Sequence, residues 1–188
     1  IETRGLFEKA YGYYECRAIC PGAAGLWGAF WTFAHGVGSI DGSGADGAEI
    51  DIMESPFYAH PKKQMRNSVT HAVHFDGYGE AHQSVLIGAY KAVNPYTEFN
   101  TYGLEWNENE YIFYINGVET DRIGGKYVSQ VEEWLLLTVE VGGNNAVPGA
   151  NEAGVVEIGG NGIITANPDD LFPVDMVVDY VRVYDRRD

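Results

Sequence analysis

Short runs of alternating apolar and polar residues, rich in aromatic and β-branched side chains, recur along almost the whole chain. No other feature constrains the fold as strongly, because successive side chains of a strand point to opposite faces and such runs predict half-buried strands. Gly, Asn, Asp and Pro separate the runs, as turns between strands require. The sequence therefore predicts an all-β protein, with strands at residues 9–20, 26–33, 48–55, 67–75, 83–91, 99–106, 110–115, 134–142 and 176–184.

Three connecting segments carry signals of their own. Asn116-Gly117 lies between YIFYI and VETDRI, and this dipeptide favours a two-residue hairpin because both central positions need positive φ. Residues 126–133 could form one short helix. Residues 142–167 contain seven Gly and several Asn, which predicts a long loop.

Strands without crossover helices can bury their apolar faces only in two stacked sheets or in a barrel. A sandwich of two antiparallel sheets suits this chain better, and its concave face would form a cleft for an extended ligand. A chain of 188 residues fits a single domain, so we expect residues 1–188 to share one core.

The chain is strongly acidic, with 27 acidic and 12 basic residues and a formal net charge of −15. A field of this sign repels nucleic acid, sulfated polysaccharide and anionic membrane surfaces. No apolar run reaches the roughly 18 residues that a membrane-spanning helix needs. We therefore expect a neutral ligand, with no nucleic acid and no membrane as partner.

The chain contains two cysteines, Cys16 and Cys20, in the alternating run YYECRAIC. Four residues of strand separate their Cα atoms by about 13 Å at roughly 3.3 Å per residue. A disulfide needs Cα atoms within about 7 Å of each other, so these two cannot bond within one strand. We expect both to be core cysteines rather than disulfide or zinc ligands.

The stretch GAEIDIME places three acids among Ile and Met in what otherwise resembles a buried strand. In a flat strand Glu49 and Asp51 share one face and Glu54 lies on the other. A β-bulge at Ile52-Met53 would return Glu54 to the face of the other two, because two residues then occupy the place of one. A solvated edge strand and a calcium-binding cluster remain alternatives for the local pattern.

Three aligned acids have a chemical use. Two Glu carboxyl groups near the roughly 5–5.5 Å of a retaining glycosidase could serve as nucleophile and proton donor. An Asp between them would orient a neighbouring Glu, and the closeness of like charges would raise the pKa of at least one carboxyl group.

The motif EIDIME resembles the active-site strand of glycoside hydrolase family 16 in its bulged form. The resemblance extends to GYYECRAICPGAAGLWGAFWTF, YGLEWNENEYIFYINGV and VVDYVRVY, in the order and spacing of the family. It implies a jelly-roll β-sandwich of the concanavalin A type, with Glu49 as nucleophile, Asp51 as assisting acid and Glu54 as general acid/base. The implied activity is endo-acting, retaining hydrolysis of β-1,3- or mixed-linkage β-1,3/1,4-glucan by a catalytic domain that needs no cofactor.

Trp27 and Trp31 are four residues apart in GLWGAFWTF and therefore share one face of a strand. Aromatic rings stack on the apolar faces of sugars, and the matching positions in the family face the cleft. The alternative is that both are core residues. We favour sugar binding, because Leu26, Phe30 and Phe33 can fill the core without them.

Polar candidates lie on two further strands. The resemblance places His74 near the catalytic acid, whereas parity puts His71 on the opposite face, in the core or at the surface. In LLLTVEVGGN, alternation sets Thr138 and Glu140 together, so Glu140 is either solvated or binds sugar hydroxyls in the cleft. Trp106 is expected in the core.

The resemblance also implies features outside the cleft. Asp179 matches a position that often binds a structural calcium on the convex side, although one Asp supplies few of the six to eight oxygens that Ca²⁺ takes. Relatives usually have a few dozen strand-forming residues before the point where this sequence begins. An edge strand and part of the cleft are therefore expected outside it, and the bare edge leaves monomer and dimer both open.

Family resemblance implies a secreted enzyme. The alternatives to a β-glucanase are a lectin-like carbohydrate-binding module, since one sandwich serves both classes, and a galactanase such as β-agarase. A binding module would not need three aligned acids.

Overall fold

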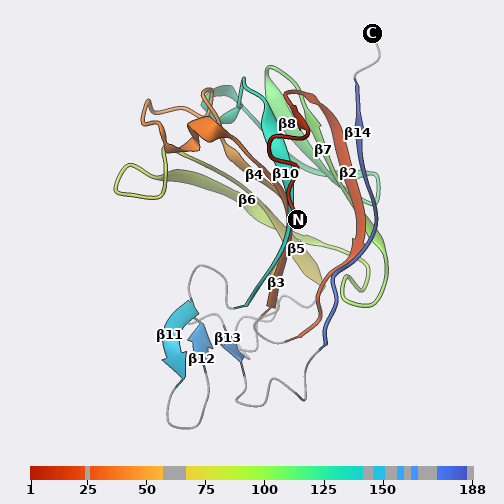
Figure 1. The fold of residues 1–188 in the computed structure, drawn as a ribbon. Coiled ribbons are helices and arrows are strands. Elements are labelled where there is room, and N and C mark those ends of the chain that lie inside the picture. The colour runs from red at the N-terminus through yellow and green to blue at the C-terminus, as the bar shows by residue number, and fades with distance from the viewer. Residues whose placement is uncertain are drawn as a thin grey trace.

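The structure, a computed structural model, describes residues 1–23, 26–56, 67–141, 146–150, 156–158, 162–164 and 173–185. Two antiparallel sheets lie face to face (Figure 1). One sheet has six strands in the order β1 (Glu8–Lys9), β10 (Glu133–Val141), β3 (Leu26–Phe33), β4 (Glu49–Pro56), β5 (Ser68–Phe75) and β6 (Gln83–Lys91). The other has five, in the order β14 (Val177–Tyr184), β2 (Gly12–Ile19), β7 (Asn100–Trp106), β8 (Glu110–Ile115) and β9 (Val118–Gly124). The predicted sandwich is confirmed.

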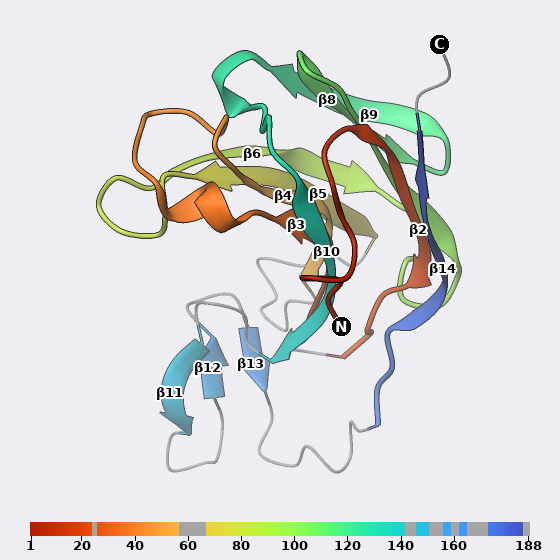
Figure 2. The ribbon, with the colours of Figure 1, turned by 45° about the horizontal axis from the view of Figure 1, so that its top comes forward.

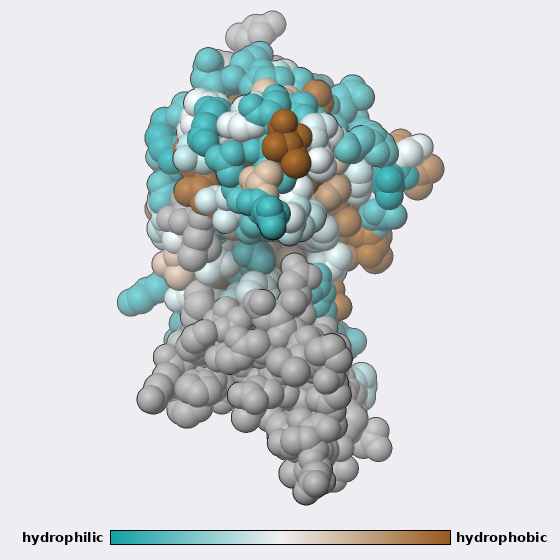
Figure 3. Space-filling view, turned by 90° about the vertical axis from the view of Figure 1, so that its left-hand side faces the viewer, coloured by the Kyte–Doolittle hydropathy of each residue, from teal (hydrophilic) through white to brown (hydrophobic). Residues whose placement is uncertain are grey.

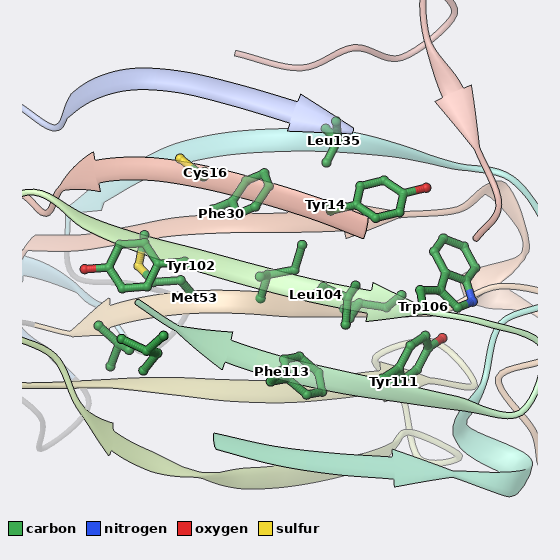
Figure 4. Close-up of a cluster of buried hydrophobic side chains, with 14 of the residues drawn as sticks. Tyr14, Cys16, Phe30, Met53, Tyr102, Leu104, Trp106, Tyr111, Phe113 and Leu135 are labelled. Carbon is green, nitrogen blue, oxygen red and sulfur yellow. The ribbon is translucent and has the colours of Figure 1, made fainter. Parts of the chain in front are cut away.

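The core fills the space between the two sheets, which the turned view in Figure 2 shows side by side. Every second residue of β2 is buried, as its alternation predicts. Side chains from both sheets meet in this core (Figure 4), among them Tyr14, Phe30, Met53 and Phe113. Burial removes large aromatic and aliphatic surfaces from water, which is the main favourable term in folding.

The structure also confirms the predictions for the two cysteines, for Trp106 and for the hairpin. Cys16 and Cys20 are free and buried, and Trp106 is buried with its indole N–H donated to the carbonyl of Ser129. The Asn116-Gly117 hairpin is confirmed, because φ is 51° and 73° at these two positions and Ile115 pairs with Val118. These local patterns therefore predicted both packing and turn geometry.

Two predictions for connecting segments were wrong. Instead of a helix at 126–133, a three-residue 3-10 helix η2 (Gly125–Tyr127) is followed by an extended segment, in which Gln130 N–H donates to Ala45. Contact with the preceding loop thus outweighs local helix propensity.

Within the predicted loop 142–167, three short strands pair into a separate sheet, and the other positions lie outside the described residues. They are β11 (Ala146–Ala150), β12 (Val156–Ile158) and β13 (Gly162–Ile164). Their Val and Ile favour strands although glycines surround them.

The edges of the two sheets differ. Residues 1–9 lie along β10, with a bridge between Glu2 and Leu136 and pairing of β1 to the start of β10. At the edge of the five-stranded sheet, β14 exposes apolar side chains that include Val177, Val178 and Val181. Association of two copies through an edge stays a prediction.

One side of the molecule, seen in Figure 3, carries mainly hydrophilic side chains in its described part, with hydrophobic residues singly or in small groups. Among the described residues, no helix is both long and apolar enough to cross a membrane.

Candidate active site

The predicted bulge in β4 is confirmed by the register of its neighbours. Asp51 pairs with Ala72 and Glu54 pairs with Thr70, so three steps on β4 face two steps on β5. Ile52 and Met53 are both fully buried on the core side. The extra residue therefore turns Glu54 to the same face as Glu49 and Asp51.

All three acids line a pocket of about 750 Å³ on the face of the six-stranded sheet that points away from the core. Its walls come from five neighbouring strands, β10, β3, β4, β5 and β6, and from the loop between β5 and β6. The lining residues are Trp27, Ala29, Trp31, Phe33, Glu49, Asp51, Glu54, Ala72, His74, Tyr78, His82, Ser84, Thr138 and Glu140. Each predicted catalytic or sugar-binding residue is among them.

Glu54 is held by two donors from neighbouring strands. The indole N–H of Trp27 donates to Oε1 at 2.9 Å and the hydroxyl of Thr70 donates to Oε2 at 3.2 Å. Burial, followed by the nearby charge of Asp51, raises the pKa of Glu54 to about 8, although both hydrogen bonds act in the opposite direction. Glu54 therefore holds a proton at neutral pH.

Asp51 and Glu49 differ in their surroundings. Burial raises the pKa of Asp51 well above its ordinary value, and the charges of Glu49 and Glu140 add to that effect. The hydroxyl of Tyr78 donates to Oε2 of Glu49. A donor at this position stabilises negative charge on Glu49.

His74 lies directly across from Glu49 on β5. Its Nε2 is 3.4 Å from Oδ2 of Asp51 and 4.0 Å from Oε1 of Glu49. On its other side, Nδ1 is 3.0 Å from Nε2 of His82, and the two rings stack with centroids 5.2 Å apart. A pair of imidazoles thus borders the acidic row.

Aromatic side chains form the wall on the β3 side. Trp31 donates its indole N–H to Thr138 on β10 at 3.0 Å. Phe33, predicted for the core, instead lines the pocket and meets Trp31 edge-on at 5.8 Å. Phe33 lies an even number of residues from Trp27 and Trp31, so it points to the same face of β3 as they do. Strand alternation therefore predicts its position better than its apolar character does.

On the β10 side, Glu140 closes the pocket. Burial raises the pKa of Glu140, and the charge of Glu49 adds to the shift. Glu140 and Thr138 share the pocket-facing side of β10, as alternation predicted.

His71 supports the bulge from the core side. It is fully buried, and its Nδ1 is 2.7 Å from the carbonyl oxygen of Ile52, the type of residue that a bulge leaves without a ladder partner. Burial lowers the pKa of His71 to about 4, so the ring is neutral and its Nδ1–H is the donor to this carbonyl. Sequence parity placed His71 away from the cleft but gave no sign of this support.

Sequence reasoning missed Tyr78 and His82. Both lie in the loop between β5 and β6, whose first residues Asp76 and Gly77 have φ of 60° and 70°. The amide of Gly77 donates to the carbonyl of Val37, which fixes the base of this loop. No periodic signal reports such a conformation, although a Tyr and a His in a Gly-rich turn after a cleft strand would be a reason to examine it.

Among the described residues, Asp179 is not part of a group of three or more His, Cys, Asp or Glu side chains that could hold a metal ion. Its Oδ2 accepts a hydrogen bond from Arg17 at 2.6 Å. The guanidinium thus balances the charge of the Asp179 carboxylate. Calcium binding stays a prediction.

The comparisons with known proteins agree with this geometry. A family model described as "Glycosyl hydrolases family 16" matches residues 2–158. A beta-glucanase of Rhodothermus marinus is 26% identical over 98% of this chain and 60% of its own length. The glucan endo-1,3-beta-glucosidase A1 of Niallia circulans is 28% identical over 98% of this chain and 26% of its own length.

A solved structure has the same fold. The laminarinase catalytic domain from Thermotoga maritima MSB8 superposes with a TM-score of 0.69 at 26% identity, covering all of this chain and 68% of that one. The chain thus spans 60% and 26% of the two curated relatives above, and about two thirds of this solved domain.

Proposed function

Because this chain belongs to glycosyl hydrolase family 16, we propose that it is an endo-acting, retaining hydrolase of β-1,3- or mixed-linkage β-1,3/1,4-glucan. One observation carries the proposal. Glu49, Asp51 and Glu54 line one pocket from a bulged strand, and burial raises the pKa of Glu54 to about 8. A carboxyl group that keeps its proton at neutral pH, beside a second Glu, is the arrangement that glycoside hydrolysis uses.

In the first step the carboxylate of Glu49 attacks the anomeric carbon while Glu54 gives its proton to the glycosidic oxygen. The bond between C1 and that oxygen breaks, and a covalent glycosyl ester forms on Glu49. Oε2 of Glu49 is held by Tyr78, so Oε1 is the attacking atom.

In the second step Glu54, now ionised, takes a proton from water as the water oxygen attacks C1. The ester bond to Glu49 breaks, and the sugar leaves with its original anomeric configuration. Burial raises the pKa of Asp51, which favours its neutral form and limits charge repulsion beside Glu49 during both steps.

The pocket walls support a neutral glucan as substrate. Trp27, Trp31 and Phe33 offer aromatic surfaces for sugar rings, and Glu140 can accept hydrogen bonds from hydroxyl groups. The net charge of −15 disfavours sulfated polymers. A polymer of this kind does not cross membranes, so an enzyme that cuts it acts outside the cell.

The test is a substrate panel of laminarin, lichenan, barley β-glucan, agarose and carrageenan. We expect oligosaccharides of intermediate size from one or more of the glucans, and proton NMR of early products should show the β-anomer first. An α-anomer first would contradict the mechanism. Binding of a glucan with no hydrolysis would favour a lectin-like module, and cleavage of agarose alone would favour a galactanase.

A further inference from the structure

Three potential metal ligands converge inside the pocket. A carboxylate oxygen of Glu49, a carboxylate oxygen of Asp51 and a ring nitrogen of His74 all lie within 4.8 Å of one another. Two carboxyl oxygens, which give up any proton when a cation binds, and one imidazole are a donor set that suits zinc and copper, whereas oxygen atoms alone suit magnesium and calcium.

The distances are close to those of a tetrahedral zinc site. Zinc lies about 2.0–2.2 Å from nitrogen and oxygen ligands, so two ligands of a tetrahedral ion are about 3.4 Å apart. Nε2 of His74 is 3.4 Å from Oδ2 of Asp51 and 4.0 Å from Oε1 of Glu49. A small movement of the Glu49 side chain would complete three ligands, with the fourth position open to the pocket.

Asp51 gives an independent reason to expect a ligand here. Its side chain is only 6% exposed and faces the pocket, and among the described residues the polar partner of its carboxyl group is Nε2 of His74, 3.4 Å from Oδ2. A buried carboxyl group with so little compensation is costly. A proton or a cation relieves that cost, and His74 stands at the right distance to share a cation.

His82 prepares His74 for the same role. Metal-binding histidines usually fix their second ring nitrogen through a hydrogen bond, which orients the ring. Nδ1 of His74 has such a partner in Nε2 of His82 at 3.0 Å. The remaining nitrogen, Nε2, points at the two acids.

We propose that Glu49, Asp51 and His74 form a binding site for a transition-metal dication of the zinc class, and that an ion bound there blocks the pocket. Glu49 uses Oε1 for the metal, because Tyr78 holds Oε2. The same oxygen is the attacking atom in the proposed hydrolysis, so metal and substrate compete. Only this inhibitory consequence rests on the proposed function; metal binding does not.

Isothermal titration of the intact chain with ZnCl₂, in a buffer that does not chelate metals, tests the binding. We expect one ion per chain, and at least about tenfold weaker binding to the His74→Gln variant, since a lost ligand costs at least as much as a lost supporting hydrogen bond. His35→Gln is the matched control, because His35 is exposed in η1 (His35–Gly38), outside the pocket. Titrations with MgCl₂ and CaCl₂ should give far weaker binding.

X-ray absorption at the zinc edge of the wild-type chain gives a measurement that needs no variant. One imidazole nitrogen with oxygen ligands is the expected first shell. Two imidazoles, or oxygen alone, would overturn the site, as would equal zinc affinity of His74→Gln and His35→Gln or no binding at millimolar zinc.

Steady-state kinetics then test the inhibition. Zinc should raise KM for a soluble β-glucan without lowering kcat, and EDTA should reverse the effect. Hydrolysis without zinc binding would overturn this inference and leave the proposed function standing. If zinc binding depends on His74 but the chain cuts no glycan, the metal site stands and the proposed function is overturned.

Discussion

Glu54, which is partly buried, and Glu133, which is fully buried, are both carboxyl groups of the six-stranded sheet, but they face opposite sides of it. Glu54 faces the pocket, and Glu133 faces the core, where Thr32 donates to it at 2.5 Å and the amide of Ala48 donates at 3.1 Å. Burial is the main cause of the raised pKa in both, to about 8 for Glu54 and about 7 for Glu133. A raised pKa therefore does not identify a catalytic acid; access of its proton to a ligand does.

The donors of the two groups reflect this difference. Those of Glu133 tie β3 and the start of β4 to β10, directly before Glu49, so its role is to join strands. Those of Glu54 fix its orientation and leave the carboxyl group at the pocket surface. The comparison predicts that Glu54 controls turnover and that Glu133 controls stability.

The largest expected effect is on turnover. Glu54→Gln should lower kcat/KM on a β-glucan by about 10²–10⁴-fold, because general acid catalysis contributes about that much. The loss should shrink on an aryl glycoside, whose leaving group needs no proton. Glu133→Gln is the matched change and should stay within a few-fold of wild type. Equal losses in the two variants would remove the distinction between the two groups.

The pH dependence of kcat/KM sharpens the same contrast. The protonated form of Glu54 is the active one, so activity should fall as pH rises through about 8. Trp27→Phe removes a hydrogen bond that lowers the pKa of Glu54, and the alkaline limb should move to higher pH. Glu133→Gln should leave that limb in place. If the alkaline limb moved in Glu133→Gln instead, the group that titrates near pH 8 would lie on the core side of the sheet, which would contradict the assignment to Glu54.

Glu133 should appear in the free energy of unfolding. Its pKa is raised from 4.5 to about 7 on folding, so its contribution is fully present below pH 4.5 and is lost as pH rises through 7. Urea unfolding gives the free energy of unfolding of wild type and of Glu133→Gln. The value for wild type minus the value for the variant should be about 3 kcal/mol larger at pH 4.5 than at pH 7.5. A difference that does not change with pH would show that Glu133 keeps one protonation state.

The pocket side of the sheet was largely readable from the sequence. Strand parity put Trp27 and Trp31 on one face of their strand and set Glu140 beside Thr138 on another, and the family resemblance assigned these faces to the cleft. The interruption of alternation at Ile52-Met53 located the bulge. Phe33 was misplaced because its apolar character was given more weight than its parity. Periodicity reports which face a strand residue occupies, so it succeeds wherever a regular strand builds the wall.

The core-side support and the loops were not readable. Glu133 opens a strand in which a buried Glu has no periodic signature, and its donors come from residues about 85 and 101 positions away. Tyr78 depends on the positive φ of Asp76 and Gly77, and Asp76 accepts from the amide of Asp41 in another loop. Such placements arise from contacts between distant segments, which local patterns do not encode.

The smallest effect is expected for Tyr78, which contacts Glu49 from the open side of the pocket. Tyr78→Phe removes a hydrogen bond to a charged group, worth about 1.5–3 kcal/mol in general. Tyr78 is 58% exposed, so water can replace its hydroxyl, and the loss in kcat/KM should be about tenfold or less. Tyr184→Phe, on the exposed strand β14, is the control and should change nothing.

The size of the loss in kcat/KM of Tyr78→Phe also shows whether Tyr78 transfers a proton or only positions Glu49. A loss near that of Glu54→Gln would mean that Tyr78 transfers a proton, because a positioning hydrogen bond open to solvent cannot account for it. A loss of tenfold or less, with an unchanged alkaline limb, would leave proton transfer to Glu54 and give Tyr78 the task of holding Oε2 of Glu49. In that case Glu54 supplies the proton, and the exposed phenol of Tyr78 only directs the attacking carboxylate.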